Sequence, residues 1–201
     1  LQSGECGMLS QQIPLYQTLL ENCDYTDLKT GPLTLEQSIV RRVFFTQTEI
    51  KRLRILDTRL ESCDLTGVNW EKSRLRKTVL HENRLLGAGL WESKFEDVFF
   101  YECNAERAMF SSAVFKATRF EKCNLREASF EGADLSGVVF ADCDLTLASF
   151  QGAKLNGTDF RTAQIDSIRI DGKALSGAII APLQAIQLIG LLGVQIKELY
   201  E

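Results

Sequence analysis

The chain has 201 residues, of which 45% are apolar and 25% charged, and its formal net charge is −4. These values are typical of a folded globular protein, and they argue against a disordered chain and a strongly basic nucleic-acid binder. No apolar run approaches the ~20 residues that span a bilayer, so we expect no membrane segment. Residues 1–12 show no signal-peptide pattern, and we expect them to be disordered or foreign to the native protein.

A five-residue repeat dominates the chain. Every fifth residue from Phe45 to Ile180 is apolar, and this phase includes ten of the twelve Phe residues. Small or apolar residues recur two positions before many of these centres, and eight of the fourteen Gly residues lie two positions after one. A period of five fits neither the 3.6 of a helix nor the 2.0 of a strand. It predicts an all-β solenoid, in which each unit buries one large and one small side chain before the chain turns.

Two segments carry the clearest copies of the repeat, CNLREASFEGADLSGVVF (residues 123–140) and ASFQGAKLNGTDF (residues 148–160). They resemble the pentapeptide repeat family, whose unit reads roughly A-(D/N)-L-(S/T)-x. The resemblance covers residues 45–180, although Leu53, Asn83 and Val98 depart from the small-residue position. It implies a right-handed quadrilateral parallel β-helix with four pentapeptides per coil. The overall layout is similar to that of the dimeric quinolone-resistance members.

The repeat phase continues before Phe45, because residues 15, 20, 25, 35 and 40 are also apolar or aromatic. The segment LKTGPLTLEQS contains a Gly-Pro pair, which is also compatible with a loop. We therefore expect the β-helix to span residues 13–181, and leave open whether residues 28–40 form a coil or a loop.

Residues 182–201 break the repeat. Pro182 suits the first turn of a helix, and the apolar residues that follow cover more than one helix face. We expect a C-terminal helix that caps the solenoid with one side and forms a homodimer with the other. The resemblance also implies a dimerisation helix followed by a short strand, here VQIKELY. The candidate interface residues are Leu183, Ile186, Leu188, Ile189, Leu191 and Leu192.

Five of the six cysteines share the small inward phase at spacings that are multiples of twenty. With four units per coil, Cys23, Cys63, Cys103, Cys123 and Cys143 lie in one column. A line of thiols does not supply the tetrahedron that zinc needs, so we interpret them as buried, reduced packing residues. Reduced thiols indicate a cytoplasmic location.

Two outward surfaces are candidates for partner binding. Residues 41–84 carry eleven Lys or Arg against six Asp or Glu, so this segment has a net charge of +5 and the remainder −9. The candidate basic face comprises Arg52, Arg54, Lys72, Arg74, Trp91 and Lys94, with a solvated charged face as the alternative. The candidate apolar face comprises Val79, His81, Phe99, Tyr101 and Val139, with half-buried turn residues that shield the wall as the alternative.

No catalytic constellation is present in the sequence. The chain has a single histidine, His81, and no phosphate-binding or dinucleotide motif, so we expect no enzyme activity, cofactor or metal. The leading hypothesis is a non-catalytic, rigid protein–protein interaction scaffold of unknown partner. The resemblance offers an alternative, a DNA mimic that engages a type II topoisomerase such as gyrase and protects it from quinolones or a toxin. The +5 segment fits this alternative poorly, because duplex DNA is negatively charged along its whole length. We do not expect direct nucleic-acid binding.

Overall fold

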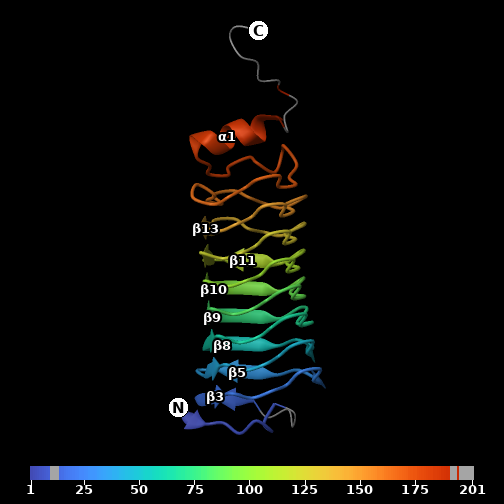
Figure 1. Ribbon diagram of the computed structural model, residues 1–201, viewed down its shortest axis with the longest axis vertical. Helices are drawn as coiled ribbons and strands as arrows, with labels where there is room; N and C mark the ends of the chain where they lie inside the picture. Colours follow the sequence, from blue (N-terminus) through green and yellow to red (C-terminus); the bar gives the residue numbers. More distant parts are fainter. Residues whose placement is uncertain (10–13, 191–193, 195–201) are drawn as a thin grey trace.

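Stacked coils of parallel strands build one elongated solenoid, which the computed structural model describes for residues 1–9, 14–190 and 194. The N-terminus lies at one end of the rod, and the helix α1 (Pro182–Ile189) lies across the opposite end (Figure 1). None of the helical segments in this described part has the length and apolar character that crossing a bilayer takes.

The described residues form thirteen short strands, eleven of which belong to one sheet, while β4 and β7 form a second. In chain order they are β1 (Gln2–Ser3), β2 (Leu15–Tyr16), β3 (Thr18–Glu21), β4 (Lys29–Thr30), β5 (Thr34–Glu36), β6 (Ile39–Arg41), β7 (Glu49–Ile50), β8 (Arg54–Glu61), β9 (Arg74–His81), β10 (Lys94–Tyr101), β11 (Val114–Lys116), β12 (Arg119–Glu121) and β13 (Val139–Ala141).

The strand register sets the size of a coil. Leu60 of β8 pairs with Leu80 of β9, which pairs with Phe100 of β10, and all of these pairs are parallel. Partners are thus twenty residues apart, which is four repeats per coil. The 28 repeat centres from Phe45 to Ile180 therefore fill seven coils, as the sequence predicts.

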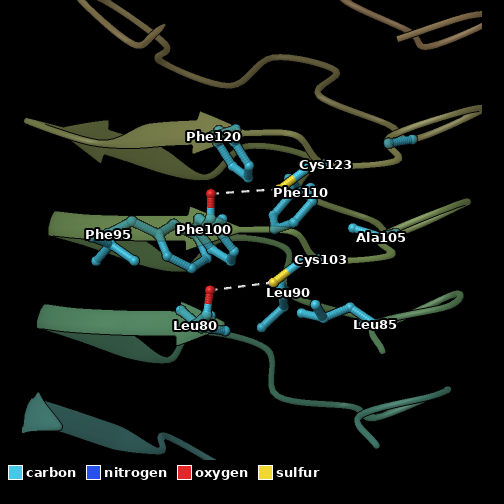
Figure 2. Packing of buried hydrophobic residues seen from close by; sticks show 14 of the residues in the cluster. Leu80, Leu85, Leu90, Phe95, Phe100, Cys103, Ala105, Phe110, Phe120 and Cys123 are labelled. Atoms are coloured by element: carbon cyan, nitrogen blue, oxygen red, sulfur yellow. Dashed lines mark hydrogen bonds between the residues drawn. The ribbon is translucent and has the colours of Figure 1, made fainter. Parts of the chain in front are cut away.

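The large residues of the repeat form the core. Every centre from Phe45 to Ile170 is buried, and Leu175 and Ile180 are half-buried at the C-terminal end. Phenylalanine rings of successive coils stack face to face, as between Phe100 and Phe120, whose centroids lie 4.4 Å apart (Figure 2). Rings from neighbouring units meet edge to face, so the core combines both favourable aromatic geometries.

The small inward position accepts polar residues because the backbone offers them acceptors. The Cys103 thiol donates to the Leu80 carbonyl of the preceding coil at 3.3 Å (Figure 2). The Thr158 hydroxyl donates to the Leu135 carbonyl at 2.8 Å. Cysteine, serine and threonine thus share this position of the repeat, in different columns, since each fills a small space and carries one donor for a buried carbonyl.

The departures from the small-residue position are also buried. Leu53 and Val98 pack in the core, and Asn83 satisfies both halves of its amide. Its Oδ1 accepts from the Cys63 backbone N–H at 2.8 Å, and its Nδ2 donates to the Leu60 carbonyl at 2.9 Å. The larger side chains therefore leave the coil intact.

The position two residues after each centre turns the chain with a left-handed backbone. Seven glycines adopt a positive φ there, but so do 23 residues that are not glycine, including Gln37 and Lys72. Their N–H groups bond to the next coil, as Gln37 does to the Leu56 carbonyl and Lys72 to the Trp91 carbonyl, both at 3.0 Å. A left-handed L-residue costs roughly 1–2 kcal/mol, and the hydrogen bonds between coils offset that cost.

The N-terminal end differs from the expected disorder. Strand β1 pairs with β3, Leu9 is buried, and a disulfide joins Cys6 to Cys23 with their Cα atoms 5.3 Å apart. The first nine residues thus cover the edge of the first coil, which would otherwise expose unpaired backbone groups. The expectation that the column cysteines are reduced is wrong for Cys23, which forms a disulfide with Cys6.

Residues 28–40 form a coil. Strand β4 pairs with β7, and both β5 and β6 pair with the long strand β8. Each pair has the same twenty-residue register as the rest of the wall. The Gly31–Pro32 pair lies between β4 and β5, at a corner of the coil.

The C-terminal helix closes the opposite end, as the sequence predicts. Leu188 and Gln184 are its buried residues. The Gln184 side-chain Nε2 donates to the carbonyls of Phe160 and Ala163 at 2.7 Å each, and its Oε1 accepts from the Ala181 N–H at 2.8 Å. One glutamine therefore satisfies two carbonyls of the last coils and the first turn of the helix.

Replacing Phe120 with alanine should lower the free energy of unfolding by about 3–5 kcal/mol, because a cavity replaces a fully buried ring. Phe44 is the matched control, since its side chain is 52% exposed and its loss should cost less than about 1 kcal/mol. Urea denaturation of both variants measures the difference. Equal losses would contradict the inward register.

In the native protein, a thiol-specific reagent should label none of the six cysteines rapidly. Burial raises the pKa of Cys63 to about 11, so its reactive thiolate is scarce at neutral pH. Mild reduction should make the exposed Cys6 the first to react. Mass spectrometry after timed alkylation follows the labelling, and fast reaction of the column would contradict its burial. The four column thiols are Cys63, Cys103, Cys123 and Cys143.

Candidate interaction surfaces

The structure brings most of the candidate basic face together. Arg54, Arg74 and Lys94 are register partners at the starts of β8, β9 and β10, and all three are exposed. We call these three residues the basic ladder. Arg52 and Lys72 lie two residues earlier on the neighbouring left-handed corner. A hollow of about 340 Å³ lies between the side chains of Arg52, Leu53, Arg54, Lys72 and Arg74.

The Trp91 ring packs beside Gly89. Any larger side chain at Gly89 would overlap the ring, and the indole Nε1 donates to Glu71 Oε2 at 2.8 Å. The tryptophan does not line the hollow. Sequence spacing places Trp91 close to Lys94, but the corner of the coil at this point directs the ring onto the adjacent wall.

The apolar face is continuous over two coils. Val79 of β9 pairs with Phe99 of β10, and the rings of Phe99 and Tyr101 lie 5.6 Å apart. The His81 ring stacks on Tyr101 with centroids 5.1 Å apart. All four side chains are half-buried on the outer wall. Val139 is in the same column but is separated from Phe99 by Arg119, with which both of them pair.

Charged groups border the apolar face. Lys122 Nζ lies 5.2 Å from the centroid of the Tyr101 ring and 3.3 Å from Glu102 Oε1. The Tyr101 hydroxyl and the Lys122 ammonium hold the pKa of Glu102 below its usual value. His81 Nε2 lies 3.8 Å from carboxylate oxygens of both Glu82 and Glu102.

His81, Glu82 and Glu102 form the one group within the described residues whose spacing could suit a metal ion, with ligand atoms within 4.8 Å of one another. Lys122 already occupies one side of Glu102 as an ion pair. Its positive charge opposes a cation at the same carboxylate, so we assign Glu102 an ion-pair role with Lys122.

The C-terminal helix presents two of the expected interface residues. Leu183 is 78% exposed and Ile186 59% exposed, whereas Ile189 is half-buried. The prediction of an interface role is wrong for Leu188, because its side chain is 5% exposed and packs on the core of its own chain. Leu191 and Leu192 lie outside the described residues, as does the expected strand apart from Val194.

Several exposed apolar side chains of the described residues escaped the sequence interpretation, Tyr16, Phe44 and Met109 among them. These three side chains are each at least 40% exposed. Each is directly next to a repeat centre, a position that the five-residue phase assigns to the outer wall. They belong to different columns of the solenoid and form no common patch. Gln184 was also missed, because no repeat phase marks a buried polar residue in the cap.

Solved structures share this architecture. HetL, a pentapeptide repeat protein involved in heterocyst differentiation regulation from the cyanobacterium Nostoc sp. strain PCC 7120, is 17% identical, with a TM-score of 0.54 over 80% of this chain and 88% of its own. QnrB1, a plasmid-mediated fluoroquinolone resistance protein, is 16% identical in its full-length structure, with a TM-score of 0.36 over 88% of this chain and 99% of its own. At these identities the likeness concerns the fold alone. No curated protein sequence matches this chain.

The repeats also match known family patterns. "Pentapeptide repeat region" matches residues 53–130, and "Pentapeptide repeats (8 copies)" matches residues 123–161. Together these matches cover more than half of the chain, and they coincide with coils whose register is twenty residues. The chain therefore belongs to the pentapeptide repeat family.

Proposed function

We propose that this protein is a non-catalytic scaffold that binds a partner protein through its apolar face. The observation that carries the proposal is the outward cluster of Val79, His81, Phe99 and Tyr101 on a wall whose other columns are mostly polar. Aromatic residues are enriched at protein interfaces and provide most of their hot spots.

The wall that carries this face is suited to binding because its backbone is held in place. Strands β9 and β10 pair over their whole length, with seven aligned residue pairs. A partner would meet side chains whose backbone is already ordered, so little conformational entropy is lost on association. Arg119, Lys122 and Glu102 form a charged rim, which is the arrangement typical of a specific interface.

Several observations support a role without catalysis. Pentapeptide repeat proteins are generally non-catalytic. The four free thiols are buried among backbone carbonyls, where they are poor nucleophiles. His81 is engaged by a stacked tyrosine and two carboxylates on a convex wall. A general base needs hydrogen-bond reach to a substrate proton, and the His81 imidazole is already engaged by these neighbours.

A mimic of duplex DNA suits the described surface less well. Such a mimic needs negative charge along its whole length. Here three adjacent coils carry the basic ladder, and no described carboxylate lies within ion-pair distance of Arg54, Arg74 or Lys94. We therefore favour a partner that recognises aromatic and apolar side chains.

The double substitution Phe99→Lys and Tyr101→Lys should remove the partner while the solenoid stays folded, because both side chains point outward. Met109→Lys is the control, since Met109 is 40% exposed in another column. Affinity capture from the native cell, quantified by mass spectrometry, should show a protein recovered with the wild type and the control but lost with the double variant. Identical recovery with all three proteins would contradict the proposal.

We further propose that the exposed side of α1 joins two copies of the chain. Leu183 and Ile186 would each gain about 1.5–3 kcal/mol from full burial, and a two-fold contact buries both without open-ended growth. Light scattering should report twice the 22.6 kDa chain mass for the wild type. Leu183→Lys with Ile186→Lys should give a monomer, whereas Leu147→Lys on the solenoid wall should not. A monomeric wild type at micromolar concentration would refute the dimer.

A further inference from the structure

Charged side chains on neighbouring coils alternate in sign along most of the solenoid. Arg41, for example, lies between Glu21 and Glu61, with ion pairs of 3.1 and 2.8 Å. Opposite charges that face each other across strands stabilise a sheet, and like charges destabilise it. Other partners spaced by twenty residues follow the same rule, namely Lys29–Glu49, Lys72–Glu92, Arg76–Glu96–Lys116, Glu102–Lys122, Arg107–Glu127 and Asp134–Lys154.

The basic ladder breaks this rule. Arg54, Arg74 and Lys94 are direct neighbours on three strands, about 4.8 Å apart. The nearby carboxylates are already engaged: Glu71 accepts from Trp91, Glu92 pairs with Lys72, and Glu96 pairs with two cations of the next column. In the part of the chain that the structure describes, no acidic group relieves the repulsion within the ladder.

The hollow beside the ladder has room for a small anion. Its volume of about 340 Å³ falls in the range of small-ligand sites. Four cations line it, namely Arg52, Arg54, Lys72 and Arg74. Guanidinium groups present two parallel N–H donors, which match the oxygens of a phosphate.

The positions of these cations are fixed by the coils. The N–H of Arg54 donates to the Leu33 carbonyl, and the N–H of Arg74 donates to the Leu53 carbonyl, both at 2.9 Å. Since the backbone is ordered before any ligand arrives, binding requires only the side chains to settle.

The length of the ladder limits the ligand. Its three cations are followed by Val114 on one side and preceded by Thr34 on the other, so the positive track ends after three coils. A single phosphate would contact only part of it, whereas a nucleic acid would extend beyond it.

We propose that Arg52, Arg54, Lys72, Arg74 and Lys94 form a binding site for a small anion with two or more linked phosphate groups. This site is separate from the apolar face, and the proposal does not depend on the partner protein suggested above. The phosphate chain lies along the ladder, and its oxygens replace the carboxylates that the other columns supply from within the chain.

Isothermal titration calorimetry with inorganic tripolyphosphate tests the site. The wild type should bind one tripolyphosphate per chain, and Arg74→Gln should weaken binding roughly tenfold or more, because it removes the central charge-assisted contact. Arg84→Gln is the matched control, since Arg84 is exposed, lies in another column and has no ion pair in the described part of the chain. Its affinity should stay within about twofold of the wild type, as expected for a surface change away from the site.

Thermal melts separate binding from folding. Arg74→Gln should unfold no earlier than the wild type, because the substitution relieves like-charge repulsion, and tripolyphosphate should raise the melting temperature of the wild type but not that of the variant. The proposal is wrong if tripolyphosphate does not bind, if both glutamine variants lose affinity equally, or if orthophosphate binds as tightly. Tighter binding of longer single-stranded oligonucleotides would also overturn it, since the ligand would then be a nucleic acid.

Discussion

Hydrogen bonding between successive coils is the constraint on which the rest of this structure depends. Each coil must use twenty residues if its N–H groups are to meet the carbonyls of the next, and four five-residue units meet that requirement. The register explains why non-glycine residues such as Gln37 and Lys72 accept a left-handed backbone, since each donates to a carbonyl nineteen positions ahead. It also places equivalent inward side chains directly above one another, which produces the stacked phenylalanines.

In such a solenoid, the backbone groups between coils are hydrogen-bonded everywhere except at the two ends. The two ends of this chain are covered in different ways. The N-terminal end is covered by β1 and tied by the Cys6–Cys23 disulfide. The C-terminal end is covered by a helix, which cannot continue the strand pattern and instead uses Gln184 to bond two carbonyls of the solenoid. Both solutions prevent further strands from adding to an open edge.

The same register governs the outer wall, where any side chain has neighbours twenty residues away. In most columns the charges alternate in sign, so they form ion pairs within the chain and few charged groups remain free to bind a partner. Two regions differ: the apolar face around Phe99 and Tyr101, and the basic ladder of Arg54, Arg74 and Lys94. Because the wall is rigid, a binding region can be recognised here by its departure from the alternation. We propose the apolar face for a protein partner and the ladder for phosphate groups.

The sequence by itself determined the solenoid, the inward phase from Phe45 to Ile180, the cysteine column and the capping helix, because a strict period of five has few physical solutions. Only the tertiary structure decided what depends on the bend of each corner and on contacts between distant segments. The Trp91 ring packs on Gly89 and does not line the hollow, and Leu188 faces its own core. Cys6 forms its disulfide with Cys23 because the first residues fold back onto the first coil. Gln184 bonds to carbonyls of the solenoid because the helix lies across the last coil. The spacing of a repeat predicts which residues share a column. It does not predict where a side chain points at a corner or how an end is covered, because both depend on local packing.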